Sequence, residues 1–245
     1  MGHALLICVL LNSVLGQEPA YPERAWRLNH KEEGIVWVWQ PAHTDPLNEI
    51  VVFVHGDNSS ADHVWEKLGI VDQFRQSGIQ ALFVVPTSAR QGWKDPIKWK
   101  GSQKLDELIQ FAIAETQSSI DQPRITLVAH SAGFRVVARW LSHPGIKKVI
   151  LSDSLFGYFP EFHQWLQASP DHQLILLVAE KGELTTKPWS WAFAQKYSEA
   201  AYFRGMPAGL VPEVNPPIVY IEVPLKHTAV FRSGEVLPYA LRIRL

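Results

Sequence analysis

Ile125-Thr-Leu-Val-Ala-His-Ser-Ala-Gly-Phe-Arg-Val-Val-Ala-Arg-Trp-Leu141 is the stretch of the 245-residue chain that decides its fold. Its first five residues form an apolar run, which is typical of a buried strand, and the residues from Gly133 onward have helical periodicity. Ser131 stands where the two patterns meet. The chain must therefore turn from strand to helix within two or three residues of this serine.

Similar apolar runs of four to six residues recur along the chain and alternate with helical patterns. We expect strands at 35–39, 50–55, 81–85, 125–129, 148–151, 174–179 and 218–223, and helices over 62–77, 103–118, from 133 onward and in the Trp-rich stretch after residue 179. Runs without period-two alternation are typical of a parallel sheet covered on both faces. The sequence thus predicts an α/β fold with a doubly wound, mostly parallel sheet flanked by helices. The segment 160–171 is short for a cap domain, so we expect little or no cap.

The composition and charge of the chain limit the classes of function that we expect of it. Hydrophobic residues make up 47% of the chain, the formal net charge is −1, and no run is rich in lysine or arginine. Such a chain can bury one large core. It lacks the cluster of basic residues that would attract nucleic acid or an anionic membrane. We therefore expect no nucleic-acid partner.

The first sixteen residues have the pattern of a secretory signal peptide. An apolar run of about ten residues, too short to span a bilayer, is followed by small residues up to Gly16. We expect residues 1–16 to be removed, leaving a single domain over 17–245 that is secreted or periplasmic and not inserted in a membrane. The only cysteine, Cys8, lies in this segment, so the mature chain would hold no disulfide.

Polar residues follow several of the predicted strands. They are His55, Asp57, His130, Ser131, Asp153, Glu180, Glu183 and His227. In open α/β sheets the ligand crevice lies beyond the carboxyl ends of the strands, so we expect these residues to share one edge.

The stretch Ala129-His-Ser-Ala-Gly133 has small residues two before and two after the serine, as a sharp strand-to-helix turn requires. It resembles the nucleophile elbow of the α/β-hydrolase superfamily, with alanine where the family more often has its first glycine. The resemblance implies that Ser131 is the nucleophile and that the Ala132 N–H points at the developing oxyanion. The alternative reading makes Ser131 a helix N-cap.

The resemblance also implies a base and an acid after the serine in the chain. His227, just after the final predicted strand, fits the base, while His143, His163 and His172 lie where solvated surface histidines are expected. Asp153 is our preferred acid because it lies immediately at a strand end. Glu183 is the main rival, with Glu180, because the commoner family position follows the next strand.

A second oxyanion donor is expected after His55-Gly56, which resembles the family's His-Gly segment: the N–H of Asp57, or that of Asn58 if the turn is wider. The resemblance implies no cofactor, and the sequence has no zinc motif or phosphate loop. Substrates would be small-molecule or cell-envelope-derived esters, amides, lactones or thioesters. A non-catalytic binding protein and an acyltransferase with the same triad remain alternatives.

Ten tryptophans are many for a chain of this length. Trp93, Trp99, Trp189 and Trp191 fall in predicted loops or insertions. They either line a pocket for an acyl group or a sugar ring, or fasten loops to the core.

Overall fold

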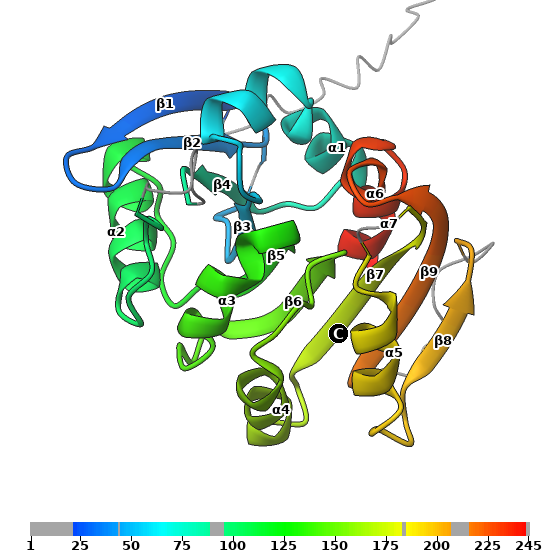
Figure 1. Ribbon diagram of the computed structural model, residues 1–245. Coiled ribbons are helices and arrows are strands. Elements are labelled where there is room, and N and C mark those ends of the chain that lie inside the picture. Colours follow the sequence, from blue (N-terminus) through cyan, green and yellow to red (C-terminus); the bar gives the residue numbers. More distant parts are fainter. Residues whose placement is uncertain (1–21, 44, 89–95, 183–184, 207–215, 244–245) are drawn as a thin grey trace, which may run out of the picture.

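The computed structural model describes residues 22–43, 45–88, 96–182, 185–206 and 216–243. Its centre is a nine-stranded sheet in the order β1-β2-β4-β3-β5-β6-β7-β9-β8 (Figure 1). The strands are β1 Arg24–His30, β2 Gly34–Gln40, β3 Glu49–Val54, β4 Leu82–Pro86, β5 Arg124–His130, β6 Ile146–Ser152, β7 Gln173–Lys181, β8 Ala201–Arg204 and β9 Ile218–Lys226. Strands β3 to β9 are parallel, and β2 runs antiparallel to both of its neighbours. The predicted mostly parallel sheet is confirmed.

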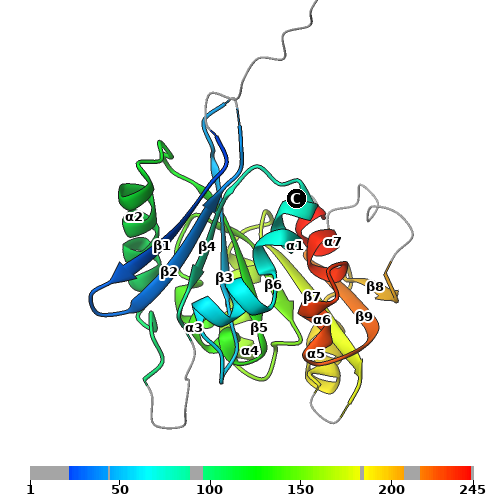
Figure 2. The same ribbon diagram turned by 90° about the horizontal axis from the view of Figure 1, so that it is seen from above.

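Helices cover both faces of this sheet. One face carries α2 (Lys104–Thr116), α3 (Phe134–Trp140), α4 (Phe159–Ala168) and α5 (Lys187–Ala194), and the other carries α1 (Ile70–Ser77), α6 (Ala229–Arg232) and α7 (Val236–Arg242). Figure 2 shows α2 and α1 on opposite sides of β2, β4 and β3. Each layer has its own apolar core, as in doubly wound sheets.

The helix predicted over 62–77 is two elements. A π-helical segment, η1 (His63–Lys67), precedes α1, and Gly69 between them has a φ of +59°. That left-handed conformation interrupts the helix, and glycine adopts it without a steric penalty. The segment expected to be too short for a cap forms α4, whose Phe162 is buried in the core.

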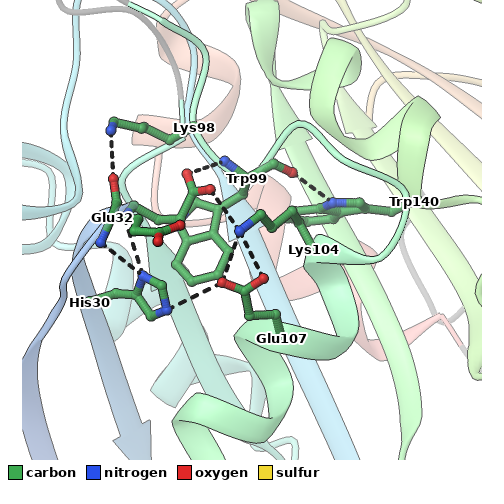
Figure 3. A network of polar contacts seen from close by, with 8 residues as sticks. His30, Glu32, Lys98, Trp99, Lys104, Glu107 and Trp140 are labelled. Atoms are coloured by element: carbon green, nitrogen blue, oxygen red, sulfur yellow. Dashed lines mark hydrogen bonds and ion pairs between the residues drawn. The ribbon is translucent and has the colours of Figure 1, made fainter.

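A network of polar contacts joins the β1–β2 hairpin to α2 (Figure 3). Lys104 Nζ lies 3.2 Å from Glu33 Oε1 and 2.8 Å from Glu107 Oε2. The backbone N–H of Trp99 donates to Glu33 Oε2 at 2.8 Å, and its carbonyl accepts a hydrogen bond of 2.9 Å from Trp140 Nε1. Trp99 is fully buried, so it fastens its loop to the core.

A second set of long-range hydrogen bonds forms at the amino end of β6. Lys148 is buried, and its ammonium donates to the carbonyls of Leu241, at 3.3 Å, and Ile243. These carbonyls end α7, where the helix dipole favours a cation. Burial lowers the pKa of Lys148 to about 8. The last helix is thereby bound to a central strand.

No helix among the described residues combines the length and the apolar character needed to span a bilayer.

Candidate active site

The turn from β5 to α3 presents Ser131 at the carboxyl edge of the sheet. A single 3₁₀ turn, Ser131–Gly133, connects the two elements, and Ser131 has a φ of +50°. That conformation is uncommon for a residue with a side chain and is typically found at functional sites. Within the described residues the Ser131 hydroxyl makes no capping hydrogen bond, so the N-cap alternative is not realised.

Small residues are required around this turn. A Cβ on Gly133 would lie 2.5 Å from the Val54 carbonyl oxygen, so only glycine allows α3 to pack against β3. Ala129, on the other side of the serine, is fully buried. The Ser154 hydroxyl donates to the Ser131 carbonyl at 2.6 Å, which fixes the turn from the neighbouring strand end.

His227 and Asp153 form a buried pair at the same edge. The Nδ1 atom of His227 lies 2.7 Å from Asp153 Oδ2, and Asp153 is fully buried. The other oxygen, Oδ1, accepts hydrogen bonds from the Thr186 N–H at 2.8 Å and from its hydroxyl at 2.7 Å. Thr186 has no local sequence signal that links it to Asp153, since it lies 33 residues further along the chain.

The rival acids are placed differently. Glu180 lies in β7 and is exposed. Glu183 falls outside the described residues. The hydrogen bond expected of Asp153 is present, and the catalytic roles of Asp153, His227 and Ser131 stay predictions.

A direct hydrogen bond between Ser131 and His227 is not seen among the described residues. Catalytic hydrogen bonds are often long without substrate and shorten only in the reacting complex. His130, which directly precedes Ser131 in the chain, has its ring centroid 4.9 Å from that of His227.

The side chain of His130, the residue before Ser131, is a buried and neutral imidazole. It lies 3.9 Å from the Phe231 ring between centroids, and has no hydrogen-bond partner for Nε2 among the described residues. Burial, and secondarily the proximity of His227, lower its pKa to about 3.

The predicted oxyanion loop also lies against Ser131. A Cβ on Gly56 would lie 2.8 Å from Ser131 Cβ and 3.3 Å from its Oγ, so the close approach requires glycine. The Asp57 carboxylate accepts a hydrogen bond of 3.0 Å from Arg135 Nη1 on α3. The predicted donors, the N–H groups of Asp57 and Ala132, therefore belong to segments on either side of the serine.

His55 stabilises this loop. The Ser88 N–H donates to His55 Nε2 at 3.1 Å, so Nδ1 carries the ring proton and donates to the Gly56 carbonyl at 3.0 Å. Burial lowers the pKa of His55 to about 4, which keeps the ring neutral.

Aromatic side chains line the approach to His227. Phe156 lies 6.1 Å from the His227 ring and 5.8 Å from Trp189 between centroids. Trp189 is exposed, as is Trp191, whereas Trp93 falls outside the described residues. Trp99 thus belongs to the core, whereas Trp189 lies on the surface beside Phe156.

No cluster of three or more potential metal ligands occurs among the residues that the structure describes.

Comparisons with known proteins rest on structure alone. No family model and no curated protein matches the sequence. A ferulic acid esterase structure covers 91% of this chain and 98% of its own, with 13% identity and a TM-score of 0.58. An S-formylglutathione hydrolase from Agrobacterium tumefaciens covers 91% and 95%, with 12% identity and a TM-score of 0.57.

A dienelactone hydrolase from Anabaena variabilis ATCC 29413 covers 90% of this chain and 93% of its own, with 11% identity and a TM-score of 0.54. Identities this low carry the fold and not the activity. The strand order with its antiparallel β2 and the structural match over nine-tenths of the chain indicate the same fold. The chain therefore has the fold of the α/β-hydrolase superfamily.

Proposed function

We propose that this protein is a serine hydrolase that cleaves a carboxylic ester or amide through an acyl-enzyme on Ser131. The observation that carries the proposal is the buried His227–Asp153 hydrogen bond of 2.7 Å at the edge where the strained Ser131 turn ends. A nucleophile, a base and an acid that orients the base are the parts that acyl transfer requires.

In the proposed reaction His227 takes the Ser131 proton as the serine oxygen bonds to the substrate carbonyl carbon. Asp153 holds Nδ1 protonated, so Nε2 faces the serine as the base. The N–H groups of Ala132 and Asp57 stabilise the oxyanion. His227 then gives the proton to the departing alcohol or amine, and a water molecule, activated by the same base, releases the acid.

An ester is the first substrate class to test. The structural neighbours include a ferulic acid esterase and a dienelactone hydrolase, and these names describe ester or lactone cleavage. An alcohol is also a better leaving group than an amine, so an assay with a chromogenic ester can detect a lower catalytic activity. Esters, amides and peptidoglycan fragments together cover the small-molecule and cell-envelope substrates that we propose.

The decisive experiment is covalent labelling with a fluorophosphonate. We expect one label, on Ser131 by mass spectrometry, and loss of both label and turnover in Ser131→Ala without a change in thermal unfolding. Residual turnover several orders of magnitude below that of the complete site is expected from binding and the oxyanion hole alone. A protein that takes no label and turns over no substrate would indicate the non-catalytic binding protein. A Ser131→Ala variant that keeps most of its activity would remove Ser131 as the nucleophile.

An acyltransferase with the same residues differs only in the acceptor of the acyl group. Product analysis with competing alcohols separates the two reactions, since a transferase forms the new ester in preference to the free acid.

Secretion is part of the proposal, on the pattern of residues 1–16, which lie outside the described residues. The mature protein should begin near Gln17 and lie outside the cytoplasm, without membrane insertion. N-terminal sequencing of protein from its native host tests this, and a chain that begins at Met1 or Gly2 would contradict it.

A further inference from the structure

An open cavity of about 550 Å³ lies between α5 and the last two strands of the sheet, β9 and β8. Figure 1 shows α5 over β9, with β8 beside it at the end of the sheet. The lining includes Lys187, Trp191, Tyr202, Arg204, Tyr220 and Glu222. None of these residues belongs to the proposed catalytic machinery, and the volume is within the range of small-molecule sites.

Three aromatic rings form one wall of this cavity. Trp191 and Tyr202 are 42% and 40% exposed, which is unusual for side chains of this size. Their ring centroids lie 5.0 Å apart with the planes tilted by 60°, and Tyr220 lies 5.4 Å from Trp191 at 76°. The rings therefore make an angled surface and not a flat slot.

Charged groups form the other side. The Glu222 carboxylate, with 7% of its side chain exposed, lies 2.6 Å from Lys187 Nζ and accepts a weak hydrogen bond of 3.4 Å from the Tyr220 hydroxyl. Arg204 has no ion pair among the described residues. Both cationic side chains remain partly in solvent and have donors to spare.

This combination disfavours three ligand classes. A cation would meet Lys187 and Arg204, which are like-charged. An acyl chain would remove water from the Glu222–Lys187 pair without replacing its hydrogen bonds, which is costly. A flat heteroaromatic ring can lie against only one face of a wall tilted by 60°.

A pyranose ring meets each requirement. Its axial C–H groups are apolar and follow an angled aromatic surface, while its hydroxyls donate to a carboxylate and accept from an ammonium or guanidinium group. We propose that this cavity is a carbohydrate-binding site, in which Trp191 and Tyr202 contact the sugar face and Glu222, Lys187 and Arg204 bind its hydroxyls. The proposal does not depend on hydrolase activity.

The test is isothermal titration of the full chain with cellohexaose, xylohexaose, chitohexaose and maltohexaose. We expect at least one to bind saturably below about 10 mM, a range typical of weak single sites. Trp191→Ala and Tyr202→Ala should each weaken that binding by about tenfold, since each removes one aromatic contact.

Trp189→Ala is the matched control. Trp189 is exposed on the same helix but contacts Phe156 instead of the cavity, so its removal should leave the affinity unchanged. Thermal unfolding of each variant shows whether it is folded, and Tyr202→Ala serves if Trp191→Ala is not. The proposal would be overturned if none of the four oligosaccharides bound, or if the folded Trp191→Ala and Tyr202→Ala variants bound with the affinity of the wild type. Displacement of the sugar by adenosine or hexanoate would also overturn it.

Discussion

Asp153 divides its two carboxylate oxygens between different partners. One oxygen accepts from His227 and the other accepts twice from Thr186, and the residue has a φ of +44° in full burial. A buried carboxylate with both oxygens bonded cannot rotate freely, so it holds the imidazole in a single tautomer and orientation. In the proposed mechanism, Asp153 and Thr186 therefore act together on the base.

Replacing Asp153 by Asn should lower kcat by about four orders of magnitude, because the amide permits the wrong imidazole tautomer. Steady-state kinetics on a chromogenic ester measures this. Glu180→Gln and Glu183→Gln are the controls, and each should cost little. A large loss in Glu183→Gln with a small one in Asp153→Asn would move the acid to the next strand.

Replacing Thr186 by Val should lower kcat by about tenfold and leave KM unchanged, because one of the two hydrogen bonds from Thr186 to Asp153 is lost. Thr186→Ser keeps the hydroxyl and should restore kcat. Thr185→Val removes a neighbouring hydroxyl that bonds to the Ala179 carbonyl instead, and should keep kcat. Equal kcat in Thr186→Val and the wild type would leave Thr186 a structural role only.

At the scale of elements, the elbow depends on how closely α3 and β3 approach. A Cβ on Gly133 would clash with the Val54 carbonyl, and a Cβ on Gly56 would clash with the Ser131 side chain. The serine conformation is therefore held by backbone packing on two sides. Strain of this kind persists only where the surrounding structure enforces it.

Gly133→Ala should reduce the free energy of unfolding by about 2 kcal/mol or more, because the backbone must move to admit the methyl group. Urea denaturation measures this. Gly157→Ala is the control, since its Cβ would meet Phe134 at 3.4 Å, an ordinary contact distance. If Gly133→Ala were as stable as Gly157→Ala, the elbow would be looser than its geometry indicates.

The seven predicted strands are recognisable because each is an apolar run, and most of them are buried on both faces. Strand β1 lacks this pattern, since four of its seven residues are polar and it lies at the sheet edge. Strand β8 has only four residues. The position of Ser131, Asp153 and His227 directly after strands was predictable from the sequence pattern. The Thr186 contact was not, because it depends on where β7 and α5 meet in space.

At the scale of the molecule, two neutral histidines lie inside the protein. His55 and His130 have folded pKa values of about 4 and about 3, against about 6.5 unfolded, and burial is the main cause of both shifts. Between these values the unfolded chain binds more protons than the folded one. The stabilisation is therefore complete above about pH 6.5 and decreases as the pH falls through that window.

The free energy of unfolding should fall between pH 6.5 and pH 4 by about 1 kcal/mol per pH unit for each of these histidines. Denaturant titrations across this range measure the slope. His130→Gln removes one titrating group and should give a shallower slope. A slope as steep in His130→Gln as in the wild type would argue against its neutral burial.

Lys148 has a consequence for how the chain is made. Its buried ammonium binds carbonyls 93 and 95 residues further along the sequence, at the end of α7. A nascent chain that has formed β6 but not α7 would hold an unpaired cation beside its central strands. We therefore expect the sheet to complete only after residue 243 has been synthesised, and chain released without α7 to be cleared by proteases.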